Sequence, residues 1–138
     1  MIRQIGKSFV LDTEHTTYGF RVLETGHLEH LYYGRKIRLD GASLEAIGEK
    51  RMFPPGNTCI YRADHPELSL EDICLEMSAS GKGDSREPFL EVIHADGSVT
   101  SDFLYEKAEI TSGKEEFRTL PGSYGEDTDV EHLMLAAL

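Results

Sequence analysis

Two pairs of titratable residues in this sequence could do chemistry if the fold brought their side chains together. His27 and His30 are of the type that binds metal ions, and Glu91 and Asp102 are of the type used in acid and base catalysis. On a strand, residues three apart point to opposite faces, so His27 and His30 cannot share a metal ion there. The sequence therefore predicts no metal site. The remaining histidines are expected at ordinary surface or half-buried positions: His15, His65, His94 and His132.

The carboxylate pair depends on the turn that lies between its two members. Asp96-Gly97, placed between two β-like runs, is typical of a type I′ hairpin turn, because both central positions of that turn need positive φ. With a two-residue loop, Glu91 faces Asp102 across the strands, and neighbouring carboxylates raise the pKa of one of them, as a general acid requires. A three-residue loop, Asp96-Gly97-Ser98, with a bulge would shift the register and separate the pair. Simple solvated carboxylates are the other alternative.

The elements that must position these groups alternate polar and apolar residues with a period of two, which is typical of β-strands. Short strands separated by turn residues predict an all-β fold, an antiparallel β-sandwich. Only Leu44–Lys50, opened by Asp40–Ser43, has helical character, and it is too short to be stable alone. The expected strands are Arg3–Ile5, Ser8–Asp12, Tyr18–Leu23, His27–Tyr33, Lys36–Leu39, Ile73–Ser78, Phe89–His94, Val99–Glu109 and Val130–Leu135.

Composition and charge exclude several classes of function. The chain has 138 residues and a formal net charge of −11, which disfavours nucleic acid and anionic membrane surfaces as partners. No apolar run approaches the roughly 18 residues that a spanning helix needs, so no membrane association is expected. Met1–Lys7 contains no apolar signal region, which favours a cytoplasmic location. Cys59 and Cys74 are then expected to be reduced thiols buried in the core.

Several phrases in this chain resemble the N-terminal domain of glycoside hydrolase family 36 α-galactosidases. They occur in the family's order and at its spacing, and together they span nearly the whole chain. One departure is Ser85, where the family more often has an aromatic residue. The phrases are His30–Ile37, Gly81–Val92, Asp96–Ser98, Ser101–Tyr105 and Leu120–Glu126.

The resemblance implies that this chain is an N-terminal, non-catalytic part of a larger enzyme. In the family, a large N-terminal β-sandwich, or supersandwich, precedes a TIM-type barrel that carries both catalytic aspartates of a retaining mechanism. Retaining chemistry needs two carboxylates roughly 5–5.5 Å apart. In this family a barrel holds them, and 138 residues cannot contain that barrel. Residues 1–138 are therefore expected to form a single β-sandwich domain or part of one, with no catalytic residue, no cofactor and no activity alone.

The resemblance also implies a role in assembly and substrate binding. Family members form homo-oligomers, in which a loop of the N-terminal domain helps to wall the sugar pocket of a neighbouring subunit. The matching stretch here is Glu49–Arg62, where Arg51 and Asn57 could bind hydroxyls of an α-galactoside oligosaccharide and Phe53 could lie against an apolar sugar face. The competing interpretation is a surface loop whose Phe53 covers the core.

Three functional hypotheses follow from the sequence. The leading one is the N-terminal domain of an α-galactosidase that acts on sugars of the raffinose and melibiose type. The first alternative is a stand-alone carbohydrate-binding or assembly module. The second is a small hydrolase that uses Glu91 and Asp102, which would require activity in the purified chain.

Overall fold

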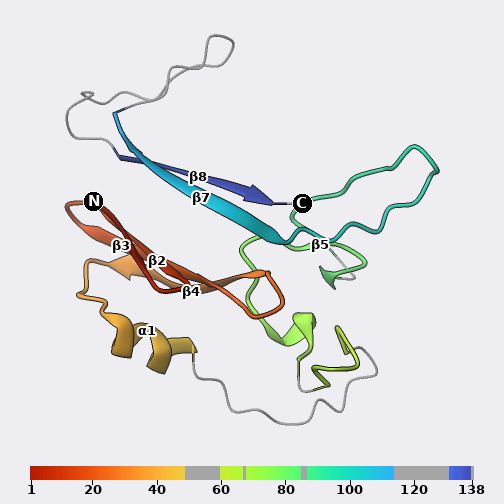
Figure 1. The fold of residues 1–138 in the computed structure, drawn as a ribbon, viewed down its shortest axis with the longest axis horizontal. Coiled ribbons are helices and arrows are strands. Elements are labelled where there is room, and N and C mark those ends of the chain that lie inside the picture. Colours follow the sequence, from red (N-terminus) through yellow and green to blue (C-terminus); the bar gives the residue numbers. More distant parts are fainter. Residues whose placement is uncertain (49–59, 67, 85–86, 114–130, 138) are drawn as a thin grey trace.

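The computed structural model describes residues 1–48, 60–66, 68–84, 87–113 and 131–137. Within these residues the chain is mostly β-strand, with one short α-helix and one turn of 3-10 helix, so the all-β, antiparallel class expected from the sequence is confirmed. The strands form a four-stranded antiparallel sheet, an antiparallel pair and a short parallel pair (Figure 1). The elements are β1 (Ile2–Ile5), β2 (Ser8–Asp12), β3 (Thr16–Val22), β4 (Leu28–Arg35), α1 (Gly41–Gly48), η1 (Leu70–Asp72), β5 (Ala79–Ser80), β6 (Gly83–Asp84), β7 (Tyr105–Ser112) and β8 (Glu131–Ala137).

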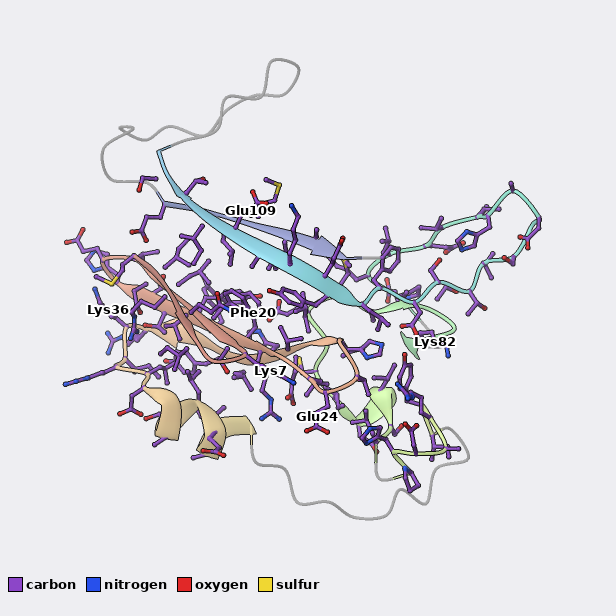
Figure 2. The ribbon with its side chains drawn as sticks, viewed as in Figure 1. Lys7, Phe20, Glu24, Lys36, Lys82 and Glu109 are labelled. Atoms are coloured by element: carbon purple, nitrogen blue, oxygen red, sulfur yellow. The ribbon has the colours of Figure 1, made fainter. Side chains whose placement is uncertain are left out.

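Aromatic side chains fill one face of the four-stranded sheet. Phe9 of β2 and Phe20 of β3 are cross-strand partners, and their rings stack with centroids 5.0 Å apart. Tyr105 of β7 meets this pair, with its ring centroid 6.3 Å from that of Phe9. The β7–β8 ribbon therefore covers this face, with Phe20 on the side that it covers (Figures 1 and 2).

The opposite face of the sheet packs against α1. Val10 follows Phe9 on β2, so it points to this second face, where it meets the buried Leu39 and Leu44. Gly19 is the cross-strand partner of Val10, and a Cβ placed on it would lie 3.3 Å from Leu39 Cδ1. A glycine at this position lets the segment that leads into α1 approach the sheet closely.

The helix begins three residues earlier than the sequence indicated. Asp40 explains the difference, because its side chain accepts a hydrogen bond from the backbone N–H of Ser43 (2.9 Å), as an N-cap residue does. The expected strand Lys36–Leu39 is not formed. Its alternating pattern instead reflects Leu39, which is buried beneath α1 while Ile37 stays exposed.

Two other expected strands, Ile73–Ser78 and Phe89–His94, are not formed, and the expected strand Val99–Glu109 is formed only from Tyr105 onward, in β7. The first follows the edge of β4: the carbonyl of Cys74 accepts a hydrogen bond from His30 N (2.7 Å), and Glu76 N donates to the Leu28 carbonyl (2.9 Å). The Cys74 side chain is exposed, so the expectation of a buried thiol is wrong there. Its backbone is held by the sheet edge while its side chain points outward.

The Asp96-Gly97 turn is formed, but it is not of type I′. His94 N donates to the Ser98 carbonyl (2.9 Å), and Gly97 N donates to the His94 carbonyl (2.9 Å), which closes a three-residue loop over residues 95–97. Within the described chain only glycines have positive φ, and Gly97 (φ 83°) is one of them, whereas type I′ would need positive φ at Asp96 as well. The turn is therefore a three-residue loop, but it covers residues 95–97 and not Asp96–Ser98.

Candidate functional site

The residues expected to bind sugar, Arg51, Phe53 and Asn57, lie outside the described residues. Of the stretch Glu49–Arg62, the structure describes the final part, Ile60–Arg62, and it also describes Gly48 directly before the stretch. The contacts that hold Gly48 and Ile60–Arg62 are described below.

Tyr61 lies in a polar cluster, which we call the Tyr61 network: Thr25 and His27, which are buried, and Tyr61 and Asp102, which are partly buried. The Tyr61 hydroxyl donates to Asp102 Oδ2 (2.8 Å), and His27 Nε2 lies 2.9 Å from Asp102 Oδ1. On the other side of the imidazole, His27 Nδ1 lies 2.9 Å from Thr25 Oγ1. An ionised carboxylate only accepts hydrogen bonds, so Nε2 of a neutral His27 carries the proton and Nδ1 accepts from the Thr25 hydroxyl.

Local backbone structure brings Thr25, His27 and Asp102 together. Leu23 N donates to the His27 carbonyl (2.8 Å) across a tight turn that contains Gly26, whose φ is 92°. Tyr105 N donates to the Gly26 carbonyl (2.8 Å), which ties the chain just after Asp102 to the turn just before β4. A Cβ on Gly26 would lie 3.3 Å from the Cβ of Leu104, so this close approach also needs glycine.

Electrostatics keep Tyr61 a hydrogen-bond donor. Burial raises the pKa of the Tyr61 phenol, and the hydrogen bond to Asp102 and its negative charge raise that pKa further. The Lys82 ammonium lies 5.2 Å from the centroid of the Tyr61 ring, where the electron-rich face attracts a cation. The imidazole of His27 meets the same ring edge-on, with centroids 4.7 Å apart, and is only 3% exposed. The cluster therefore holds Tyr61 by its hydroxyl and by its ring.

The catalytic carboxylate pair considered from the sequence is not formed. Both oxygens of Asp102 accept hydrogen bonds from the Tyr61 network, and Glu91 is exposed. These contacts do not favour the alternative of a small hydrolase built on these two carboxylates, which the activity of the purified chain tests. The sequence could identify Asp102 as a titratable residue, but its partners lie 75 and 41 positions away and carried no local signal.

The two histidines at 27 and 30 have separate partners. His30 Nδ1 lies 2.8 Å from Glu76 Oε1, and the Tyr18 hydroxyl donates to the other oxygen of the same carboxylate. Within the described ranges, no group of three or more His, Cys, Asp or Glu side chains is placed to hold a metal ion.

A second cluster, which we call the Gly48 anchor, holds the start of the undescribed stretch: Arg21, Glu29 and Gly48. Arg21 Nε donates to Glu29 Oε2 (2.6 Å), while an NH₂ group of the same guanidinium donates to the carbonyl of Gly48, the last residue of α1 (2.7 Å). Glu29 is 1% exposed and faces Arg21 across β3 and β4. These opposite charges at facing positions of one hairpin could have indicated the ion pair, but the sequence analysis did not identify it.

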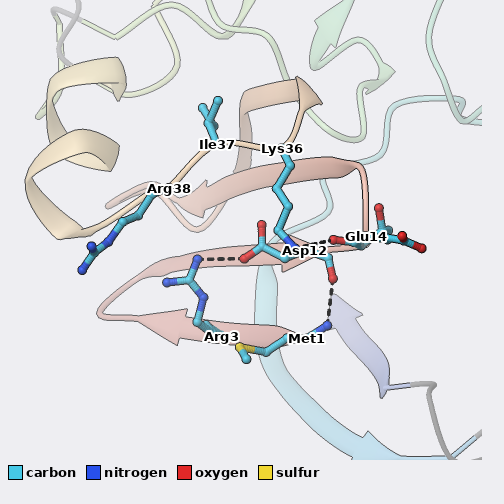
Figure 3. A pocket seen from close by; sticks show the side chains of 8 residues that line it. Met1, Arg3, Asp12, Glu14, Lys36, Ile37 and Arg38 are labelled. Carbon is cyan, nitrogen blue, oxygen red and sulfur yellow. Dashed lines mark hydrogen bonds and ion pairs between the residues drawn. The ribbon is translucent and has the colours of Figure 1, made fainter.

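A surface cavity of about 760 Å³ lies at the other end of the sheet (Figure 3). Several of its charges are bound within the protein: Arg3 donates to Asp12 (2.9 Å), Lys36 Nζ donates to the Thr13 carbonyl (2.9 Å), and the amino group of Met1 donates to the Asp12 carbonyl (2.8 Å). Burial raises the pKa of Asp12, but hydrogen bonds from Thr17 and Arg3 and the charge of Arg3 outweigh it and lower that pKa. The cavity is a salt-bridged edge of the sheet rather than an evident ligand site.

No helix in the described part of the chain is long and apolar enough to cross a membrane.

Comparison with known proteins identifies relatives for nearly the whole chain. It is 30% identical over 127 residues to the bifunctional alpha-galactosidase/sucrose kinase AgaSK of Mediterraneibacter gnavus. This match covers 92% of this chain and 13% of that protein. It is 29% identical over 123 residues to the alpha-galactosidase AgaA of Geobacillus stearothermophilus, covering 87% of this chain and 16% of that protein. This chain therefore spans less than a fifth of the length of either relative.

Solved structures show the same fold. The crystal structure of the alpha-galactosidase from Lactobacillus brevis matches with a TM-score of 0.83 and 25% identity, covering 96% of this chain and 18% of that one. A variant of AgaA solved in complex with raffinose matches with a TM-score of 0.81 and 26% identity, covering 94% of this chain and 18% of that one. The family model described as the glycosyl hydrolase family 36 N-terminal domain matches residues 26–137. The chain belongs to this family.

Proposed function

We propose that this chain is the N-terminal, non-catalytic domain of a retaining α-galactosidase that hydrolyses terminal α-galactosides of the raffinose and melibiose type. The observation that carries the proposal is the family match over residues 26–137, on a chain that spans less than a fifth of two α-galactosidase relatives. The rest of such an enzyme supplies the two carboxylates that retaining hydrolysis needs. In this chain, Asp102 binds His27 and Tyr61, which supports a structural role for its carboxylate.

The proposed contribution of this domain is assembly and substrate binding in a cytoplasmic homo-oligomer that needs no cofactor. Glu49–Arg62 walls the sugar pocket of a neighbouring subunit, with Arg51 and Asn57 binding sugar hydroxyls and Phe53 against the sugar ring. The chemistry of these side chains supports the assignment, as does the raffinose bound in a related structure.

Activity of the whole gene product and of residues 1–138 tests the proposed enzyme. The whole product should hydrolyse raffinose and an aryl α-galactoside, whereas residues 1–138 alone should not exceed the buffer rate. Turnover by residues 1–138 would contradict the proposal. A whole product that binds sugar without hydrolysing it would favour the stand-alone binding module instead.

Substrate selectivity tests the role of the loop. In the full-length enzyme, Phe53→Ala or Arg51→Ala should weaken kcat/KM for raffinose by about 1–3 kcal/mol and leave the aryl galactoside nearly unchanged, since the oligosaccharide extends further beyond the galactose than the aryl group does. Equal losses on both substrates, or a lowered melting temperature, would show that the loop serves the fold.

A further inference from the structure

A row of aromatic side chains leads from the core of the four-stranded sheet to its surface at Tyr33. The rings of Phe20 and Tyr18, both on β3, have centroids 5.8 Å apart. Tyr18 in turn meets Tyr33 of β4 edge-on, with centroids 6.1 Å apart. Phe20 is buried, whereas Tyr33 is 69% exposed. The row therefore ends in an aromatic ring that contacts the protein on one side and is open to solvent.

A β-bulge brings His30 to the same surface. Residues three apart on a regular strand point to opposite faces, but the register between β3 and β4 shifts next to Phe20. Tyr33 is the cross-strand partner of Tyr18, and beyond the shift His30 is the partner of Phe20. The centroid of the His30 imidazole accordingly lies 5.5 Å from that of the Tyr18 ring. His30 and Tyr33 therefore both contact Tyr18, although they are three residues apart on one strand.

Glu76 joins these rings from a distant part of the chain. Its Oε1 lies 2.8 Å from His30 Nδ1, and its other carboxylate oxygen accepts a hydrogen bond from the Tyr18 hydroxyl. The backbone of Glu76 is bound to β4 as well, because its N–H donates to the Leu28 carbonyl (2.9 Å). The carboxylate is therefore fixed beside the aromatic rings. We call Tyr18, His30, Tyr33 and Glu76 the Tyr33 surface.

The polar groups of the Tyr33 surface have the capacity to bind hydroxyl groups. A carboxylate oxygen has more than one lone pair, so each oxygen of Glu76 can accept a further hydrogen bond. When Nδ1–H of a neutral His30 donates to Glu76, Nε2 on the far side of the imidazole is an acceptor. The side chains of His30 and Glu76 are 30% and 19% exposed, so solvent and small ligands reach them. Burial raises the pKa of the Tyr18 phenol, and the hydrogen bond and charge of Glu76 raise it further, which keeps Tyr18 a donor to Glu76.

This combination of groups favours an uncharged sugar ring over other ligands. A single exposed tyrosine is ordinary, but here the exposed ring lies beside a fixed carboxylate and an imidazole. A sugar ring presents C–H groups that can lie on an aromatic ring, and hydroxyls at its rim that need hydrogen-bond partners. A phosphate would be repelled by Glu76 and by the net charge of −11. An apolar partner would remove the Glu76 carboxylate from water without replacing the lost hydrogen bonds.

We propose that the Tyr33 surface is a binding site for a neutral oligosaccharide, with one sugar ring stacked on Tyr33 and its hydroxyls bound by Glu76 and His30. That the oligosaccharide is an α-galactoside rests on the proposed function. The four side chains are ordered by contacts with one another before the sugar arrives, which lowers the entropic cost of binding. The site binds sugar and performs no chemistry.

The first experiment detects binding at individual residues of the full-length protein. A brief pulse of hydroxyl radicals oxidises exposed tyrosines, and mass spectrometry of the tryptic peptide 22–35 distinguishes Tyr33 from Tyr32. Tyr32 is the internal reference, because it is partly buried and packs against the opposite face of the sheet. Raffinose at about 50 mM, well above the millimolar Kd expected of one small open site, should lower the Tyr33-to-Tyr32 oxidation ratio by about twofold or more.

A matched additive separates binding from a general effect of the solution. Sorbitol at the same concentration is a neutral polyol that consumes radicals but has no sugar ring, and it should leave the Tyr33-to-Tyr32 ratio unchanged. An unchanged ratio in raffinose overturns the proposal, and so does an equal fall in sorbitol. If Tyr33 is not oxidised even without sugar, the rest of the full-length protein covers it, and the proposal is overturned by that result as well.

The second experiment tests the stacking itself, with oxidation of His30 as the readout. Raffinose should protect His30 in the wild-type protein and in Tyr33→Phe, which keeps the ring, but not in Tyr33→Ala. Phe89→Ala removes another exposed aromatic ring, one that is 75% exposed and outside the Tyr33 surface, and it should leave the protection of His30 intact. Protection that persists in Tyr33→Ala, or that is lost equally in Phe89→Ala, overturns the proposal.

The surface site and the proposed function fail in different ways. If raffinose protects Tyr33 and His30 but the whole gene product does not hydrolyse raffinose, the surface site stands and the proposed enzyme is wrong. If the whole product hydrolyses raffinose but neither residue is protected, the proposed enzyme stands and the surface site is wrong.

Discussion

Asp102 connects three parts of the chain, and its charge makes the connection strong. Hydrogen bonds to a charged group are worth more than those between neutral groups, and Asp102 accepts one from His27 and one from Tyr61. Its side chain is 28% exposed, so solvent screens it only in part. The carboxylate therefore contributes to stability as well as to position.

Removing the charge of Asp102 should destabilise the protein. Asp102→Asn retains the shape but weakens both bonds, and the expected loss is about 1–3 kcal/mol of the free energy of unfolding, measured by urea denaturation. Glu91→Gln is the control and should change little, because Glu91 is exposed. Stabilisation by Glu91→Gln would instead indicate repulsion between the two carboxylates, and it would support the pairing of Glu91 with Asp102 considered from the sequence.

The Asp12 carboxyl should make stability depend on pH in the acid range. Its pKa in the folded protein lies below the unfolded value of about 3.9, because the hydrogen bonds from Thr17 and Arg3 outweigh the effect of burial. The stabilisation is therefore fully present above about pH 4 and is lost as the pH falls through the folded pKa. Asp12→Asn should lower stability at neutral pH and flatten the fall between about pH 4 and 2. An unchanged slope would show that other carboxyls cause the acid sensitivity.

At the residue scale, sequence reasoning found candidate groups but not their partners. Asp102 and His27 were both singled out, yet as members of other pairs, since contacts across 75 positions depend on tertiary packing that no local pattern encodes. The pairing of Arg21 with Glu29 could have been predicted from the sequence, because a hairpin with its turn near Thr25 places them opposite one another. The residues chosen for sugar binding lie outside the described part of the chain and remain predictions.

Strand prediction worked where consecutive strands form a simple antiparallel sheet. The elements β1 to β4 pair in chain order, so local alternation and turn residues were sufficient to indicate them. It failed at Lys36–Leu39, Ile73–Ser78 and Phe89–His94, whose alternation comes from one buried residue or from a few bonds to a neighbouring edge. An alternation with a period of two indicates only that successive side chains face opposite sides of the segment. It does not require that each such segment forms a strand.

The short helix α1 should depend on a single buried residue. Leu44 is 2% exposed and packs with Val10 and Leu39 against the sheet, so Leu44→Ala removes much of the contact that holds the helix. The expected loss is about 2–5 kcal/mol of unfolding free energy. Ile47→Ala, at a position on the same helix that is 39% exposed, should cost no more than about 0.5 kcal/mol. Similar losses for both would mean that the burial of Leu44 does not determine the stability of α1.

The whole molecule leaves apolar side chains in contact with solvent. On the β7–β8 ribbon Ile110 is 42% exposed and Leu135 is 38% exposed, and in the segment near the 95–97 turn Phe89 is 75% and Ile93 is 73% exposed. Single exposed apolar residues are ordinary, but these lie on two separate parts of the fold, the β7–β8 ribbon and the segment that leads into β7 (Figure 1). The relatives are several times longer than this chain, so in the proposed full-length enzyme other parts of the protein are available to cover them.

Residues 1–138 prepared alone should therefore associate with themselves. Apolar attraction between Phe89 and Ile93 of different molecules is opposed by a net charge of −11, so association should strengthen as salt rises from about 10 to 500 mM and screens the repulsion. Sedimentation velocity should show a mean sedimentation coefficient that increases with protein concentration. Phe89→Ser with Ile93→Ser should return the chain to a monomer, whereas Met134→Ser, at a residue that is 50% exposed on β8, should have a smaller effect. A single monomeric species at high micromolar concentration and high salt would show that the chain closes its own core and needs no cover from the rest of an enzyme.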